Sequence, residues 1–178
     1  MFSLGKVATF ALFVLGVAAS AVPTKRQESA VEILDKLASD VSPIAAKFAS
    51  MTPATANVFA VQGVVAQIKP LVSEASTKIA ALPRGSADKT ATIKSLANVF
   101  NAILQPSHKL VTTPGVNAVT IIPIFTQLGA TLAALLANVV TLVEELLTAV
   151  VGILQGLITG LDGILGNLGL TGLTAGGF

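Results

Sequence analysis

The chain has 178 residues, of which 53% are hydrophobic and 11% charged, and it contains no cysteine. This length allows one domain with a buried core, and the lack of cysteine excludes a disulfide-stabilised scaffold. A formal net charge of +2 without a basic cluster excludes the usual features of a nucleic-acid-binding protein. No zinc-ligand spacing, phosphate-binding glycine loop or Gly-x-Ser-x-Gly motif occurs. The sequence therefore predicts a protein that is not an enzyme and holds no metal or cofactor.

Residues 1–21 have the pattern of a signal peptide. Lys6 precedes the apolar run 7–17, and Ala19-Ser20-Ala21 is the small-x-small pattern that signal peptidase accepts. The run is too short for a membrane anchor. We therefore expect export, with a first cleavage after Ala21.

A short propeptide, residues 22–26, is expected to follow and to end in the dibasic site Lys25-Arg26. Cleavage there would leave Gln27 as the first residue of the mature protein. Removal of residues 1–26 takes away three basic residues, so eight remain against nine acidic ones. The mature protein is then close to neutral.

Three amphipathic helices are predicted in the first part of a helical domain that spans 27–161, over about 29–51, 54–82 and 87–104. In each of them apolar residues recur at steps of three and four, as on one face of a helix. The three apolar stripes are Leu34, Leu37, Val41, Ile44, Phe48 and Met51; Val58, Val61, Val65, Ile68, Val72, Ala75, Ile79 and Leu82; and Ile93, Leu96, Phe100, Ile103 and Leu104.

Prolines and one serine suggest how these helices bend, begin and end. Pro43 is expected to kink or split the first helix, and Pro70 to bend the second. Ser86 is a candidate N-cap of the third helix. Gln105-Pro106 is expected to end that helix, which would place the single histidine, His108, in the loop that follows.

The last predicted helix is longer and more apolar than the others. From about 118 to 160 no residue forces a stop, although Gly129 could bend the helix. Its polar residues form a single narrow stripe, so most of its surface must be covered by something. We therefore predict an all-α bundle of about four helices, followed by a loose Gly/Leu-rich tail over 162–178.

The apolar surface of this long helix is the candidate interaction site. A few exposed aliphatic side chains there would drive adsorption to an apolar surface or self-association. The residues chosen for this face are Leu146, Leu147, Val150, Ile153, Leu154, Leu157 and Ile158.

Three glycines, Gly152, Gly156 and Gly160, follow one another at steps of four in the same region. A small-xxx-small face of this kind lets two helices approach closely. Three interpretations stay open: packing within the chain, self-association, and insertion into a bilayer. The uncharged segment 121–143 is long enough to span a membrane.

Three groups of residues are catalytic candidates by residue type. Ser86 and Lys89 fit Ser-x-x-Lys, but the companion motifs of that enzyme class are absent. His108 has no second histidine or cysteine as a metal-binding companion, and Glu144 and Glu145 are adjacent, so they point in different directions on a helix. We interpret these residues as a helix start, a loop histidine and solvated acids.

Several segments together resemble the small cysteine-free secreted hyphal matrix proteins of mushroom-forming fungi (the Schizophyllum type). These segments are the leader that ends in Lys25-Arg26-Gln27, Ser42-Pro43-Ile44-Ala45, Met51-Thr52-Pro53-Ala54-Thr55-Ala56-Asn57, Val64-Val65-Ala66-Gln67-Ile68-Lys69 and Ile122-Pro123-Ile124-Phe125. The chain is similar, more loosely, to the fungal hydrophobic surface-binding and cell-wall mannoprotein family.

The resemblance implies a non-enzymatic structural protein of the cell wall or extracellular matrix. Its expected partners are apolar surfaces, wall or matrix components and further copies of itself, with lipid or membrane as another partner and no nucleic acid. The alternative function is a secreted helical module that binds a lipid or another apolar ligand, or a secreted effector.

Overall fold

The computed structural model describes residues 28–145, 147–158, 160–168 and 170. The predicted signal peptide, the propeptide and the processing residues Ala21, Lys25 and Arg26 lie outside these ranges, and so does Leu146. The described residues form an all-α bundle, which confirms the predicted fold class. Its helices are α1 (Ala30–Ser50), α2 (Val58–Ala80), α3 (Lys89–Thr112), α4 (Ala118–Val143), α5 (Leu147–Leu157) and α6 (Leu161–Asn167).

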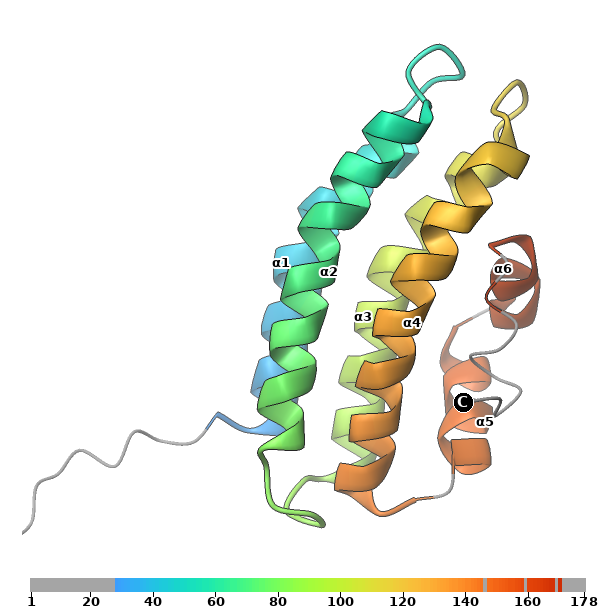
Figure 1. The fold of residues 1–178 in the computed structure, drawn as a ribbon. Helices are drawn as coiled ribbons and strands as arrows, with labels where there is room; N and C mark the ends of the chain where they lie inside the picture. Colours follow the sequence, from blue (N-terminus) through green and yellow to red (C-terminus); the bar gives the residue numbers. More distant parts are fainter. Residues whose placement is uncertain (1–27, 146, 159, 169, 171–178) are drawn as a thin grey trace, which may run out of the picture.

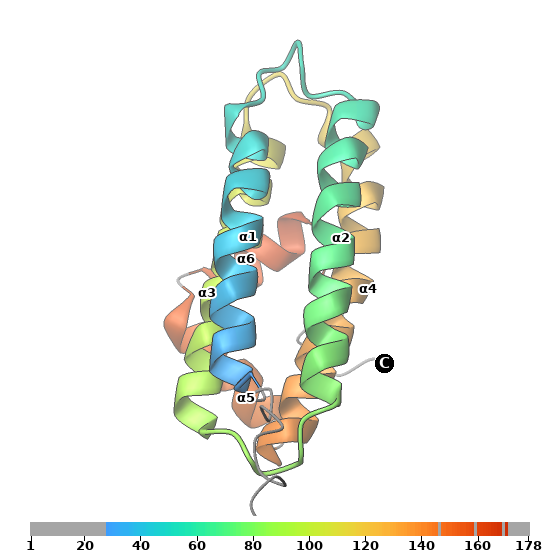
Figure 2. The ribbon, with the colours of Figure 1, turned by 90° about the vertical axis from the view of Figure 1, so that its left-hand side faces the viewer.

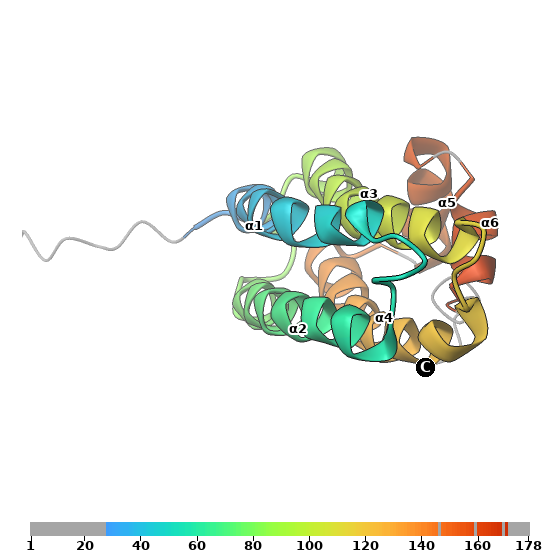
Figure 3. The same ribbon diagram turned by 90° about the horizontal axis from the view of Figure 1, so that it is seen from above.

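The first four helices form two antiparallel hairpins that lie against each other (Figure 1). Figure 2 shows α1 beside α2, and Figure 3, seen along the bundle, shows α1 next to α3 and α2 next to α4. The last two helices form an additional layer on the side of α3 and α4 that faces away from α1 and α2 (Figure 3). The expected number of about four helices thus describes the central bundle, and α5 and α6 are added to it.

Side-chain caps set the starts of the first three helices. Ser29 and Glu32 form a reciprocal capping box at α1, in which the Glu32 N–H donates to Ser29 Oγ at 3.2 Å and the Ser29 N–H donates to Glu32 Oε2 at 2.8 Å. Asn57 Oδ1 accepts the N–H of Ala60 at the start of α2, at 2.9 Å. For α3 the cap is Asp88, not Ser86 as predicted, because the Asp88 carboxylate accepts a backbone N–H of the first turn.

Four prolines, Pro43, Pro70, Pro106 and Pro123, lie inside helices that continue past them. Pro43 does not split α1, and Pro70 lies within α2. The prediction that Pro106 ends the third helix is wrong, because α3 runs on to Thr112 and includes His108. The apolar stripe of α3 continues beyond the proline to Leu110, which is 1% exposed, and burial of that turn offsets the lost backbone hydrogen bond.

The core runs along the whole length of the four-helix bundle. The predicted stripes are buried in it, except that Ile44, Met51 and Leu82 are half-buried and Val58 is exposed. Near one end the rings of Phe48 on α1 and Phe125 on α4 meet edge to face, with centroids 5.3 Å apart. Toward the other end, where α2 and α4 finish, Asn138 of α4 donates to Ser76 Oγ of α2 at 2.8 Å, which pairs two polar side chains between the helices.

The predicted continuous helix over 118–160 is divided at Glu144. This residue has φ 54° and ψ 40°, the left-handed conformation that ends many helices. The Gly85 N–H of the α2–α3 turn donates to the Leu142 carbonyl at 2.7 Å, and Lys89 Nζ lies 2.7 Å from Glu145 Oε1. The chain therefore reverses, and α5 runs back along α3.

The predicted loose tail is in part a helix. Residues Leu161–Asn167 form α6, and the segment buries four aliphatic side chains, namely Ile164, Leu165, Leu168 and Leu170. Leu170 Cδ2 occupies the place where a side chain at Gly129 would begin. Gly129, the residue at which the sequence allows a bend, makes room for Leu170 to pack on α4.

By length and composition α4 could cross a membrane, and among the described residues it is the only helix of at least 18 residues that meets this test. Half of its most apolar window, 50%, is buried inside the bundle. Packing on α2 and α3 accounts for this buried half.

Candidate interaction surface

Helix α5 buries one face and exposes the other. Val150, Val151 and Leu154 are at most 6% exposed and belong to the hydrophobic core, and α5 packs mainly on α3. Ile158, just after the helix, is also buried. The outer side of α5 has no helix of the described chain packed on it (Figure 3).

The structure thus separates the predicted apolar face into two parts. Ile153 and Leu157 are exposed, at 46% and 49%, whereas Val150, Leu154 and Ile158 are buried. Leu147 is half-buried against the core.

The predicted glycines lie on the exposed side of α5 and just beyond it. A Cβ added at Gly152 or Gly156 would meet no neighbouring atom within 4 Å. Among the described residues, then, no neighbour packs closely on these two glycines, and the three interpretations of the glycine face stay predictions. Gly160 has φ +75°, so it serves as the left-handed turn between α5 and α6.

We call Gly152, Ile153, Gly156 and Leu157 the α5 outer face. Among the described residues, the charged one nearest to this face in the sequence is Asp162. Its carboxylate accepts a hydrogen bond from the Gln155 amide at 3.0 Å. Two half-exposed aliphatic side chains beside two bare stretches of helix backbone make a shallow apolar surface. Its chemistry suits contact with another apolar surface.

A second apolar surface lies at the end of the bundle where α2 and α4 begin (Figure 1). Phe59 is 85% exposed and Val119 is 80% exposed, and Val58 beside Phe59 is also exposed. We call these three residues the bundle tip. Sequence reasoning did not select Phe59, although its position off the apolar stripe of α2 was the available signal.

At the opposite end of the bundle a pocket of about 360 Å³ opens between the start of α1 and the α2–α3 turn. Its wall combines apolar and polar side chains, among them Val31, Leu82, Pro83, Ala87 and Thr92. Thr92 is fully buried, and its hydroxyl has no hydrogen-bond partner among the described residues. The wall is therefore mixed, because Glu28, Ser29, Ser86 and Asp88 also line the pocket, and the unsatisfied Thr92 hydroxyl is itself buried from solvent.

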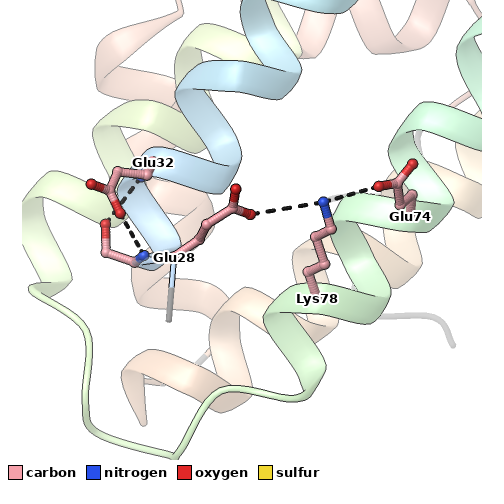
Figure 4. A network of polar contacts seen from close by, with 5 residues as sticks. Glu28, Glu32, Glu74 and Lys78 are labelled. Atoms are coloured by element: carbon pink, nitrogen blue, oxygen red, sulfur yellow. Dashed lines mark hydrogen bonds and ion pairs between the residues drawn. The ribbon is translucent and has the colours of Figure 1, made fainter. Parts of the chain in front are cut away.

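Beside this pocket, ionic contacts of Lys78 join two residues of α2 and connect α2 with Glu28, which precedes α1 (Figure 4). Lys78 Nζ lies 2.9 Å from Glu74 Oε1 and 3.8 Å from Glu28 Oε2. The hydrogen bond with Lys78 lowers the pKa of Glu74, and the same bond raises the pKa of Lys78. These groups are solvent-exposed, so the contacts stabilise the fold only slightly.

The three catalytic candidates do not form a site in the structure. Ser86 donates to the Pro83 carbonyl, Lys89 pairs with Glu145, and His108 Nε2 lies 3.0 Å from Asn167 Nδ2. The described residues contain no group of three side chains suited to hold a metal ion.

Comparisons with known proteins returned no match of significance, whether with family models, curated proteins or solved structures.

Proposed function

We propose that the protein is a secreted, non-enzymatic structural protein of the fungal cell wall or extracellular matrix. It acts by adsorbing to apolar surfaces and by associating with copies of itself. The observation that supports this most directly is the α5 outer face, where Ile153 and Leu157 stand exposed beside two uncovered glycines. The pattern of residues 1–26 supports export, and the resemblance to hyphal matrix proteins supports the location.

The mechanism is physical. Complete burial of a leucine or isoleucine contributes about 1.5–3 kcal/mol, so half-exposed ones contribute roughly half of that each. One molecule therefore adsorbs weakly through these side chains. A layer of molecules that also associate with one another adsorbs strongly, because many such contacts act together. The uncovered glycines allow a second helix to approach α5 closely, which favours such a layer.

The experiment is partitioning of the purified secreted protein between buffer and hydrophobic beads, with circular dichroism to follow helicity. We expect strong bead binding with retained helix, and a loss of binding in the double variant Ile153→Ser/Leu157→Ser. Ala149→Ser, on the exposed side of the same helix, is the matched control and should bind like the wild type. A monomeric protein that ignores the beads would contradict the proposal.

The pocket beside Thr92 favours a second candidate, a carrier of an apolar ligand. Its volume of about 360 Å³ falls in the range of small-molecule sites, and Val31, Leu82, Pro83 and Ala87 supply apolar contacts for such a ligand. Mass spectrometry of an organic extract of the purified protein tests this function. A stoichiometric bound lipid would favour the carrier, whereas ligand-free protein that oligomerises would favour the structural protein.

A further inference from the structure

The bundle tip is built from segments of the chain that carry no charge. Residues 48–68 and 110–143, which include both loops at this end and the first turns of α2 and α4, contain no ionisable side chain. Phe59 and Val119 are each the second residue of their helix, and both project at this end. The described chain thus presents an aromatic and an aliphatic side chain on an uncharged end.

Several backbone groups of the two tip loops are paired within the loops, although the Asn117 side chain makes no cap hydrogen bond. The Thr52 N–H donates to Thr55 Oγ1 at 2.9 Å, and the N–H groups of Thr55 and Ala56 donate back to the Thr52 carbonyl. In the other loop the N–H of Val116 donates to the Thr113 carbonyl. Backbone groups satisfied in this way lose little when water is removed, which is what an apolar phase requires.

Two lysines lie just below the tip. Lys47 is in the last turn of α1 and Lys109 is in the last turn of α3, and both helices end at this side of the bundle (Figure 1). Both residues are exposed, and the Lys47 ammonium donates to Gln67 Oε1 at 3.0 Å. The pair of cations one turn below an apolar end is complementary to phosphate groups above hydrocarbon.

We propose that the bundle tip docks on a lipid bilayer that carries anionic headgroups. Phe59 and Val119 enter the headgroup–acyl boundary, and Lys47 and Lys109 meet the lipid phosphates. The bundle then stands on the membrane with its opposite end, which carries Asp88, Glu144 and Glu145, in water. This inference is independent of the α5 outer face, which lies on the side of the bundle.

The lysines decide between a bilayer and the other surfaces that an apolar tip could meet. A bare apolar solid offers them no anionic partner, so contact there would depend on Phe59 and Val119 alone. An acidic protein would be bound through the lysines, with little need for a fully exposed phenylalanine. A lipid surface uses both features at once.

The absence of tryptophan and tyrosine from the chain makes a direct test simple. Phe59→Trp introduces the only tryptophan, and its fluorescence reports whether position 59 leaves water. With vesicles of phosphatidylcholine and phosphatidylserine we expect a blue shift and protection from acrylamide. Leu157→Trp, on the α5 outer face, is the control and should stay accessible.

Binding constants for the same vesicles test which side chains carry the contact. Phe59→Ser and Val119→Ser should each weaken binding about tenfold, as expected for an apolar side chain left in water. Ile153→Ser/Leu157→Ser should bind like the wild type. If Phe59→Ser has no effect, or if only the α5 variant loses binding, the inference is wrong.

The lysines have matched controls on their own helices. Lys47→Gln/Lys109→Gln should weaken binding by roughly fivefold per lysine, and the loss should vanish on phosphatidylcholine alone. Lys36→Gln/Lys94→Gln removes exposed lysines farther from the tip on α1 and α3 and should have little effect. An equal loss in both pairs would show that only net charge matters and would overturn the proposed docking geometry.

The proposed function and this inference fail in different ways. Wild-type protein that binds hydrophobic beads but neither kind of vesicle would retain the former and refute the latter. Protein that binds vesicles through Phe59 but does not bind the beads would refute the proposed function and support docking of the bundle tip on a bilayer.

Discussion

Gly63 and Gly129 are both interior helix residues, yet their surroundings differ. A Cβ at Gly63 would meet nothing within 4 Å, whereas a Cβ at Gly129 would coincide with the Leu170 side chain. Gly63 therefore only weakens α2, whereas Gly129 makes room on α4 for Leu170 of the C-terminal segment.

The pair gives a prediction at the scale of single residues. Gly63→Ala should raise the free energy of unfolding by about 0.5–1 kcal/mol, because alanine favours a helix. Gly129→Ala should not raise it, because the end of the Leu170 side chain must first shift away from the added methyl group. Urea unfolding followed by circular dichroism measures both, and a stabilised Gly129→Ala protein would mean that Leu170 does not pack there.

At the scale of helices, the turn between α4 and α5 depends on the conformation of Glu144. The left-handed region costs an ordinary residue about 1–2 kcal/mol, and glycine avoids this cost. Glu144→Gly should therefore raise the free energy of unfolding by about 1 kcal/mol. Glu145→Gly, which removes the partner of Lys89 and has no such strain to relieve, is the control and should not stabilise the protein. A destabilised Glu144→Gly protein would indicate that the Glu144 side chain, and not its backbone, holds the turn.

Helix α5 carries a second prediction, on the role of its glycines. Because Gly152 and Gly156 touch nothing, Gly152→Ala/Gly156→Ala should stabilise the monomer by about 1–2 kcal/mol in total. If they form the self-association face, the same variant should weaken oligomers in sedimentation, since added methyl groups hold the helices apart. Gly63→Ala should raise the melting temperature without changing association. Unchanged oligomers in the double variant would remove the glycines from the interface.

For the whole molecule, the prediction concerns maturation. Secreted protein should begin at Gln27, and the variant Lys25→Ala/Arg26→Ala should begin at Val22 if signal peptidase cuts after Ala21. Mass spectrometry of the intact secreted protein checks both. A wild-type product that keeps residues 22–26 would refute cleavage at the dibasic site.

The sequence by itself determined the all-α class, the buried stripes of α1 to α3 and the start of α4, because helical periodicity and caps act over a few residues. It did not determine how far α3 or α4 extends. Burial of Leu110 carries α3 past Pro106, and the Gly85 N–H together with the Lys89–Glu145 pair ends α4 at Glu144. Contacts between residues so far apart leave no local pattern in the chain. For the same reason only the tertiary structure decided which apolar residues face solvent. Ile153 and Leu154 are neighbours of equal hydrophobicity, and it is the packing of α5 on α3 that buries one and exposes the other.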